Sequence, residues 1–155
     1  MGIFSKLADA VTGNWVKVHL QWSEPALGKP IEVRIQADNL KSDHDAEGVY
    51  VQVMAEERVK VPEVHVAETV NGVLQEKVKD IENAVITFDQ KFPIAGPQSL
   101  KAGQSYEWSG TVTLPADARP TYIGLNAGHA WKIRAGLDVK GNDPDSGWAA
   151  ITLGR

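Results

Sequence analysis

The stretch Ile31-Glu32-Val33-Arg34-Ile35-Gln36-Ala37-Asp38 decides the fold, because apolar and polar side chains alternate along its whole length. Successive side chains of a β-strand point to opposite faces, so this alternation predicts a strand with one face in a core and the other in water. Further strands are predicted over residues 15–22, 49–55, 85–92, 106–114, 129–139 and 148–153. Gly, Pro, Asn and Asp residues punctuate the intervals between them. The pattern indicates an all-β sandwich or barrel rather than alternating strands and helices, and we expect an immunoglobulin-like sandwich.

The N-terminal residues follow a different period. Over residues 3–11 the apolar side chains recur at helical spacing, and Gly13 follows as a stop signal. Because no other segment has this spacing, the sequence predicts a single short N-terminal helix. The expected organisation is an amphipathic segment at residues 1–13 followed by one β-sandwich domain at residues 14–155.

The region between residues 56 and 80 is less regular. Its β-branched residues favour strand, but Pro62 has no N–H to donate to a ladder and therefore predicts a sheet edge or a break. Asn71-Gly72 is a strong signal for a two-residue hairpin turn, since both central positions of a type I′ turn need a positive φ.

Composition excludes several classes of function. The formal charge of −4 and the pI near 5.5 argue against nucleic-acid binding, which needs a basic face. The absence of cysteine excludes disulfides, thiolate metal sites and a cysteine nucleophile. No apolar run approaches the roughly 20 residues of a transmembrane helix. The N-terminal segment does not match a signal peptide, because polar residues interrupt its apolar run. We therefore expect a cytoplasmic protein.

Several blocks of the chain resemble the N-terminal domain of arrestin-like proteins. They are Leu27-Gly28-Lys29-Pro30-Ile31-Glu32-Val33, residues 100–108, Leu114-Pro115, Tyr122-Ile123-Gly124 and residues 130–139. The nearest pattern is that of the bacterial sporulation-control proteins of arrestin type. The resemblance implies an arrestin-like sandwich and a regulatory or scaffold role in binding a protein or peptide. Such proteins usually pair two sandwich domains, whereas one is expected here, so a contact between domains would need two copies.

Catalytic and metal-binding patterns are missing from the sequence. We find neither a G-x-S-x-G turn nor a phosphate-binding glycine loop, and the adjacent Glu56 and Glu57 would face opposite sides of a strand. The four histidines have no metal-ligand spacing. We expect no enzymatic activity and no cofactor.

Two acidic loops leave one alternative open. The first is Asp43-His44-Asp45 with Glu47, and the second contains Asp138, Asn142, Asp143 and Asp145. Turn chemistry explains them most simply, because Asp and Asn tolerate unusual backbone angles. The alternative is a calcium-dependent binding sandwich, since calcium prefers several hard oxygen ligands from flexible loops.

Two segments are the candidate contact surfaces. The N-terminal stripe of Ile3, Phe4, Leu7 and Val11 either docks on its own sandwich or binds a partner. A peripheral membrane contact is a third role, although one lysine gives little attraction to anionic lipid. Val64 and Val66 are expected at a sheet edge where a partner adds a strand. An alternative of another class is a self-assembling structural protein, in which edges and the N-terminal arm join copies.

Overall fold

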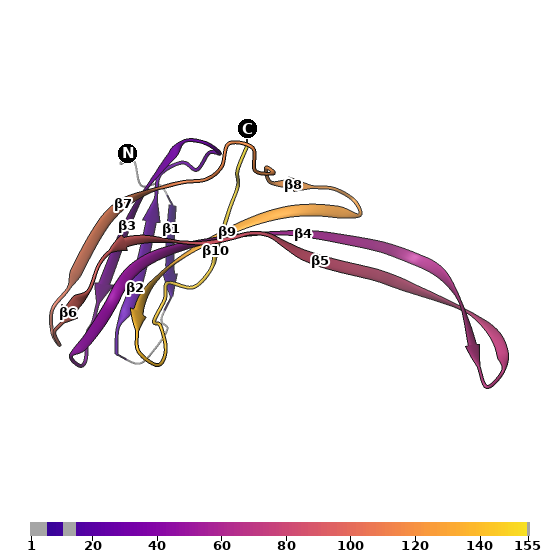
Figure 1. The fold of residues 1–155 in the computed structure, drawn as a ribbon, viewed down its shortest axis with the longest axis horizontal. Helices are drawn as coiled ribbons and strands as arrows, with labels where there is room; N and C mark the ends of the chain where they lie inside the picture. The colour runs from indigo at the N-terminus through magenta and orange to yellow at the C-terminus, as the bar shows by residue number, and fades with distance from the viewer. Residues whose placement is uncertain (1–5, 11–14, 155) are drawn as a thin grey trace.

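The computed structural model describes residues 6–10 and 15–154, which form two antiparallel sheets (Figure 1). The four-stranded sheet has the order β1-β2-β3-β7, with β1 at Lys6–Ala10, β2 at Lys17–Trp22, β3 at Pro30–Asp38 and β7 at Tyr106–Thr113. The six-stranded sheet has the order β10-β9-β4-β5, with β4 at His44–Val70, β5 at Val73–Ala95, β9 at Ala127–Val139 and β10 at Ala149–Ile151. β6 (Gln98–Leu100) pairs with β4, and β8 (Tyr122–Ile123) pairs with β9.

The predicted all-β sandwich is confirmed, and the alternating residues supply its core. Val33 and Ile35 of β3 are fully buried, as are Val51 and Val53 of β4, whereas Glu32 is exposed and Arg34 is half-buried on the other face of β3. Burial of such apolar faces is the main source of stability for a sandwich of this kind. Trp22 and Trp131 lie in the same core.

The predicted N-terminal helix is wrong over residues 6–10, which form β1. This segment pairs antiparallel with β2, and Leu7 lies opposite Gln21. An isolated helix of this length is marginal in water, while pairing with β2 gives the main chain hydrogen-bond partners along its length. Ile3, Phe4 and Val11 lie outside the described residues.

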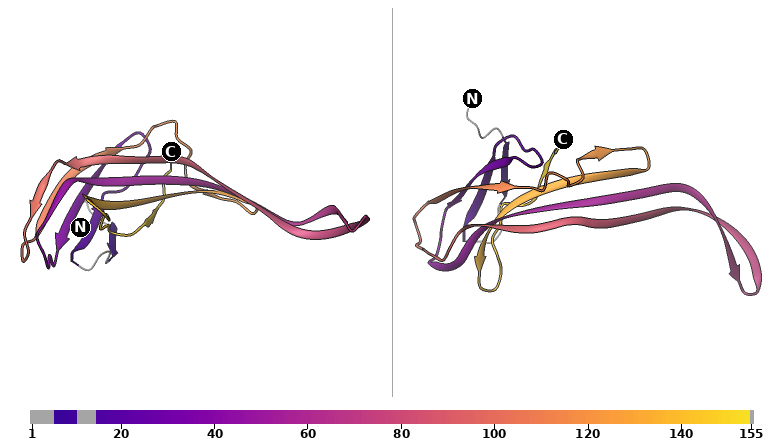
Figure 2. Two further views of the ribbon diagram at one scale, coloured as in Figure 1. Left: turned by 60° about the horizontal axis from the view of Figure 1, so that its bottom comes forward. Right: turned by 45° about the horizontal axis from the view of Figure 1, so that its top comes forward.

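β4 and β5 are far longer than the other strands and form a projecting hairpin (Figures 1 and 2). β9 pairs with β4 only as far as Val59, which lies opposite Ala127. Beyond that point β4 and β5 continue as a two-stranded ribbon, here called the arm and comprising residues 60–82. The arm ends at Asn71-Gly72, where φ angles of 51° and 78° confirm the predicted type I′ turn.

A β-bulge interrupts the arm at Pro62. The register shifts between Val61 and Val64, and the extra residue Glu63 adopts a φ of 54°. Pro62 removes one main-chain donor, and the carboxylate of Asp80 accepts a hydrogen bond from the Glu63 amide at 3.3 Å. The predicted edge at Pro62 is confirmed, because β4 has only β5 as a neighbour here.

Within residues 6–10 and 15–154, no helix is long and apolar enough to cross a membrane.

Candidate binding surfaces on the arm and the six-stranded sheet

One face of the arm and its base is rich in aliphatic side chains. Residues directly opposite each other in an antiparallel pair share a face, and the register therefore assigns the members of this face. Its aliphatic members are Val59, Val61, Val64, Val66, Val70, Val73, Ile81 and Val85, here called the valine face. Lys77 and Lys79 lie on the same face, opposite Val66 and Val64. It continues the inner face of the six-stranded sheet outward, past the end of the sandwich.

The valine face is largely open to solvent. Val61 is 41% exposed, Ile81 44% and Val73 58%, and Val64 and Val66 are half-buried. Single exposed aliphatic residues are ordinary on protein surfaces, but a cluster of them marks an interaction site. Here Val64 and Val66 of β4 lie beside Lys79 and Lys77 of β5, so the face presents aliphatic and cationic groups together. None of residues 60–82 is buried, so the arm adds no core of its own.

The opposite face of the arm carries most of its acidic side chains, together with the exposed Leu74 and Val78. The Lys60 ammonium lies 3.3 Å from Glu82 and 3.6 Å from Asp80, and His65 lies 2.6 Å from Glu76 across the strands. The hydrogen bond to Glu82, followed by the charges of Glu82 and Asp80, raises the pKa of Lys60. Exposed pairs of this kind contribute little stability, so their main effect is to keep this face hydrated.

The arm also leaves main-chain groups without a sheet partner. The Lys60 amide donates to the carbonyl of Asn126 at 2.7 Å, at the end of the contact between β4 and the β8–β9 turn. Past this point no strand of the described chain lies beside β4 on its outer side, and β5 is an edge strand along its whole length. Unpaired edges of this kind are templates for strand addition.

The contact residues that the sequence predicts lie in separate parts of the structure. Val64 and Val66 lie on the arm, opposite Lys79 and Lys77, at an edge that agrees with the expected setting for strand addition. Leu7 belongs to β1, at the edge of the other sheet. The structure does not bring Leu7 together with Val64 and Val66.

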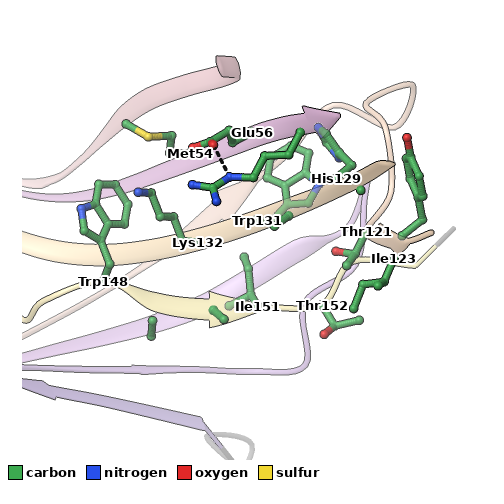
Figure 3. A pocket seen from close by; sticks show the side chains of 16 residues that line it. Met54, Glu56, Thr121, Ile123, His129, Trp131, Lys132, Trp148, Ile151 and Thr152 are labelled. Carbon is green, nitrogen blue, oxygen red and sulfur yellow. Dashed lines mark hydrogen bonds and ion pairs between the residues drawn. The ribbon is translucent and has the colours of Figure 1, made fainter. Parts of the chain in front are cut away.

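A groove lies on the outer face of the six-stranded sheet, beside β9 (Figure 3). It has a volume of about 580 Å³. Its lining is mostly apolar and includes Met54, Tyr122, Ile123, Trp148 and Ile151. Sequence reasoning missed this groove, because it joins β4, β8, β9 and β10 from distant parts of the chain.

The polar groups of the groove are largely paired with one another. Arg58 Nε lies 2.6 Å from Glu56 Oε1, and the Lys132 ammonium lies over the Trp148 ring at 4.5 Å from its centroid (Figure 3). The Glu56 carboxylate raises the pKa of Arg58 through this hydrogen bond and its charge. A groove of this composition can hold an apolar segment, but it offers no nucleophile with an adjacent base.

His129 is a structural residue beneath the groove. It is 1% exposed, with Nε2 at 2.6 Å from Thr87 Oγ1 and Nδ1 at 3.0 Å from the Pro120 carbonyl. A carbonyl only accepts, so Nδ1 is the protonated nitrogen of the ring. Trp131 Nε1 donates to the carbonyl of Arg119 at 2.8 Å. The two side chains together fix the loop before β8 against the sheet.

A polar network covers the same outer face nearer the acidic loop. Arg134 donates to Gln52 Oε1 and lies 3.3 Å from Asp145, and the Tyr50 hydroxyl donates to Asp143 Oδ2 at 2.9 Å. Burial raises the pKa of the Tyr50 phenol well above its usual range, and the hydrogen bond and charge of Asp143 add to the effect. The network is structural, since its polar groups satisfy each other.

The carboxylates of both acidic loops accept hydrogen bonds in their own turns. Asp43 accepts from the Ala102 amide at 2.8 Å, Asp143 from the Val139 amide at 3.1 Å, and Asp145 from the Gly147 amide at 2.7 Å. This agrees with the turn interpretation. Within the described ranges no three His, Asp or Glu side chains are grouped so as to hold a metal ion.

Comparisons with known proteins show a likeness in fold to solved structures. No protein-family model matches the chain, and no curated protein matches it. A solved structure of Spo0M, a sporulation control protein from Bacillus subtilis, is similar with a TM-score of 0.58 and 17% sequence identity. The match covers 92% of this chain and 51% of that chain, so this chain spans about half of Spo0M's length. At this identity the likeness establishes a shared fold.

Proposed function

We propose that this protein is a non-catalytic binding module of arrestin-like type, with a regulatory or scaffold role in a bacterial cytoplasm, and that the arm is its contact surface for other proteins. The observation that carries the proposal is the valine face, an exposed cluster of aliphatic side chains on a ribbon that projects from the sandwich. The fold shared with Spo0M and the resemblance to arrestin-like proteins support the class.

The arm gains stability when a partner covers it. An isolated two-stranded hairpin is at best marginally stable in water and gains stability from a third strand or a packed face. The arm has both an open apolar face and unpaired edges, so a partner that covers either one stabilises it. Each aliphatic side chain that becomes fully buried contributes about 1.5–3 kcal/mol.

Non-catalytic binding also fits the groove beside β9. Its titratable groups are a mutually paired Glu56 and Arg58, a buried and doubly bonded His129, a lysine over a tryptophan ring, and the Tyr122 phenol. An acid–base catalyst needs a group within reach of a bound substrate and with a proton to exchange. The groove fits better as a secondary site for an apolar segment of the partner.

An arm-less variant tests the proposal. Val59 and Asn83 are opposite each other in the register, so Asn-Gly in place of residues 60–82 joins them through a two-residue turn. Full-length and arm-less proteins are used as baits in a lysate of the source organism, and the captured proteins are identified and then bound in purified form. We expect the full chain alone to retain its partner.

Capture of the same partner by both proteins would contradict the arm as the contact surface. A third bait that lacks residues 1–13 separates the second expected surface, the N-terminal stripe. Loss of the partner with this bait, and not with the arm-less one, would move the binding site to the N-terminus.

A further inference from the structure

The two edges of the arm differ in whether they can pair with the same edge of a second copy of the chain. A two-fold axis that joins identical strands antiparallel within one sheet keeps each residue on its own face, so it pairs only residues of the same face. Like charges directly opposite each other destabilise such a pair. The sequence of each edge therefore determines which symmetric pairings it permits.

The edge of β5 opposes pairing with itself. Glu76, Asp80 and Glu82 share one face, and Lys77 and Lys79 share the other. A two-fold axis at any residue from 76 to 82 places two acidic side chains, or two lysines, directly opposite each other. An axis at residue 78, for example, pairs Lys77 with Lys79, and one at residue 81 pairs Asp80 with Glu82. Charges placed in this way protect an edge from association.

The edge of β4 over residues 64–70 has no such protection. An axis at Val66 pairs Val66 with itself, His65 with Ala67 and Val64 with Glu68. An axis at Ala67 pairs Val66 with Glu68, His65 with Thr69 and Val64 with Val70. Neither arrangement opposes two like charges.

Within the β4 edge, the main-chain groups that such a pairing needs point away from β5. Val70 and Val73 flank the two-residue turn and form a hydrogen-bonded pair in that geometry. Counting back from Val70 in steps of two, Glu68, Val66 and Val64 also direct their main-chain groups toward β5. The N–H and C=O groups of the alternate residues, Thr69, Ala67 and His65, therefore point away from β5. These groups are free to pair with the same groups of a second copy.

We infer that two copies of this chain associate through their arms, β4 against β4 and antiparallel, about a two-fold axis at Val66 or Ala67. The joined arms form a four-stranded sheet in the order β5-β4-β4-β5, with the valine faces of both copies on one side. The bulge at Pro62 and the turn at Asn71-Gly72 bound the paired segment at its two ends. This inference rests on the proposed function, because it names a partner for the arm.

The shape of the chain accommodates this pairing. The arm projects well clear of the sandwich in every view (Figures 1 and 2), and antiparallel arms place the two sandwiches at opposite ends. The paired segment supplies about four to six main-chain hydrogen bonds between the copies. A contact of this size is at the low end of specific interfaces, so we expect a dimer that dissociates on dilution.

Cysteine cross-linking tests the inference directly, because the natural chain has no cysteine. A residue on the axis meets its own copy, so Val66→Cys or Ala67→Cys brings two thiols within disulfide distance. Val78→Cys is the matched control, since Val78 lies opposite His65 on the same arm, is 58% exposed and belongs to the protected β5 edge. Each full-length variant is oxidised with oxidised glutathione, which takes up the two electrons released per disulfide, and is analysed without reductant.

We expect the Val66→Cys or the Ala67→Cys variant to form covalent dimers at least tenfold faster than the Val78→Cys variant, and the faster of the two reports the axis. Sedimentation of the unmodified chain is expected to give a concentration-dependent dimer that the arm-less variant does not form. Cross-linking of all three variants at equal rates, or a strict monomer at high concentration, would overturn the dimer. If the arm-less variant still loses a captured protein in that case, the proposed function stands without the dimer.

Discussion

Gly136 of β9 lies directly opposite Tyr50 of β4, and the Tyr50 ring occupies the space in which a side chain at position 136 would begin. The ring therefore lies across the neighbouring strand, where its hydroxyl reaches Asp143 and the Lys91 ammonium lies 4.5 Å from its centroid. A residue without a Cβ is the condition for this arrangement. The missing side chain at Gly136 therefore allows Tyr50 to hold the acidic loop through its hydrogen bond to Asp143.

Substitution Gly136→Ala is expected to lower the free energy of unfolding by about 1–3 kcal/mol, because the new methyl group overlaps the Tyr50 ring and forces it away from Asp143. Urea denaturation measures the change. Gly96→Ala is the control, since a Cβ there meets nothing within 4 Å, and its effect is expected within about 0.5 kcal/mol. In a Tyr50→Ala background the cost of Gly136→Ala should largely disappear, and a cost that persists there would contradict the overlap.

Tyr50 is expected to remain protonated at a pH at which ordinary tyrosines ionise. Its pKa in the folded state is raised above the unfolded value of about 10. The neutral phenol therefore stabilises the fold fully below about pH 10, and this contribution is lost as the pH rises through the folded-state pKa. Ultraviolet titration of phenolate, compared between the unmodified chain and a Tyr50→Phe variant, should assign to Tyr50 a transition well above about pH 10. A Tyr50→Phe variant that instead loses absorbance change near about pH 10 would refute this assignment.

His129→Leu is expected to destabilise the sandwich by about 1–3 kcal/mol, because the Pro120 carbonyl and the Thr87 hydroxyl lose their buried partner. Chemical denaturation monitored by tryptophan fluorescence tests this, with His65→Leu on the exposed arm as the control. The control change is expected within about 0.5 kcal/mol. Equal effects of the two substitutions would argue against the structural role of His129.

Removal of the arm is expected to leave the sandwich folded. None of residues 60–82 is buried, so the arm-less variant keeps every core side chain, and its free energy of unfolding should change by less than about 1 kcal/mol. Thermal and urea unfolding at low protein concentration measure the change. An unfolded arm-less chain would contradict the separation between arm and core.

The sequence predicted the sandwich and the turn of the arm for clear physical reasons. The strands of the sandwich have one dry face, and their alternation is therefore visible; Asn71-Gly72 requires the positive φ angles that only a few residues adopt readily. The length of the arm was not predicted. Both of its faces are wet, and the register shifts at Ala55/Glu56 and Val61/Val64 break the period.

Two other features depend on contacts that a sequence does not reveal. The helical spacing of residues 3–11 gave the wrong structure for residues 6–10, since pairing with β2 outweighed a weak local preference. Tyr50 and Asp143 are 93 residues apart, and the groove joins four strands, so neither follows from local patterns. The edge at Val64 and Val66 was predicted through Pro62, a purely local signal.

The most direct test of the central claim, that the valine face of the arm is the contact surface, compares two double variants of the arm. Val64→Lys with Val66→Lys places two charges on the valine face, and Leu74→Lys with Val78→Lys places two charges on the opposite face, away from the β4 edge. Binding of the purified partner to each folded variant is measured by titration calorimetry. We predict at least a tenfold loss of affinity for the first variant and a change below threefold for the second. Equal affinities for the two variants would contradict the claim.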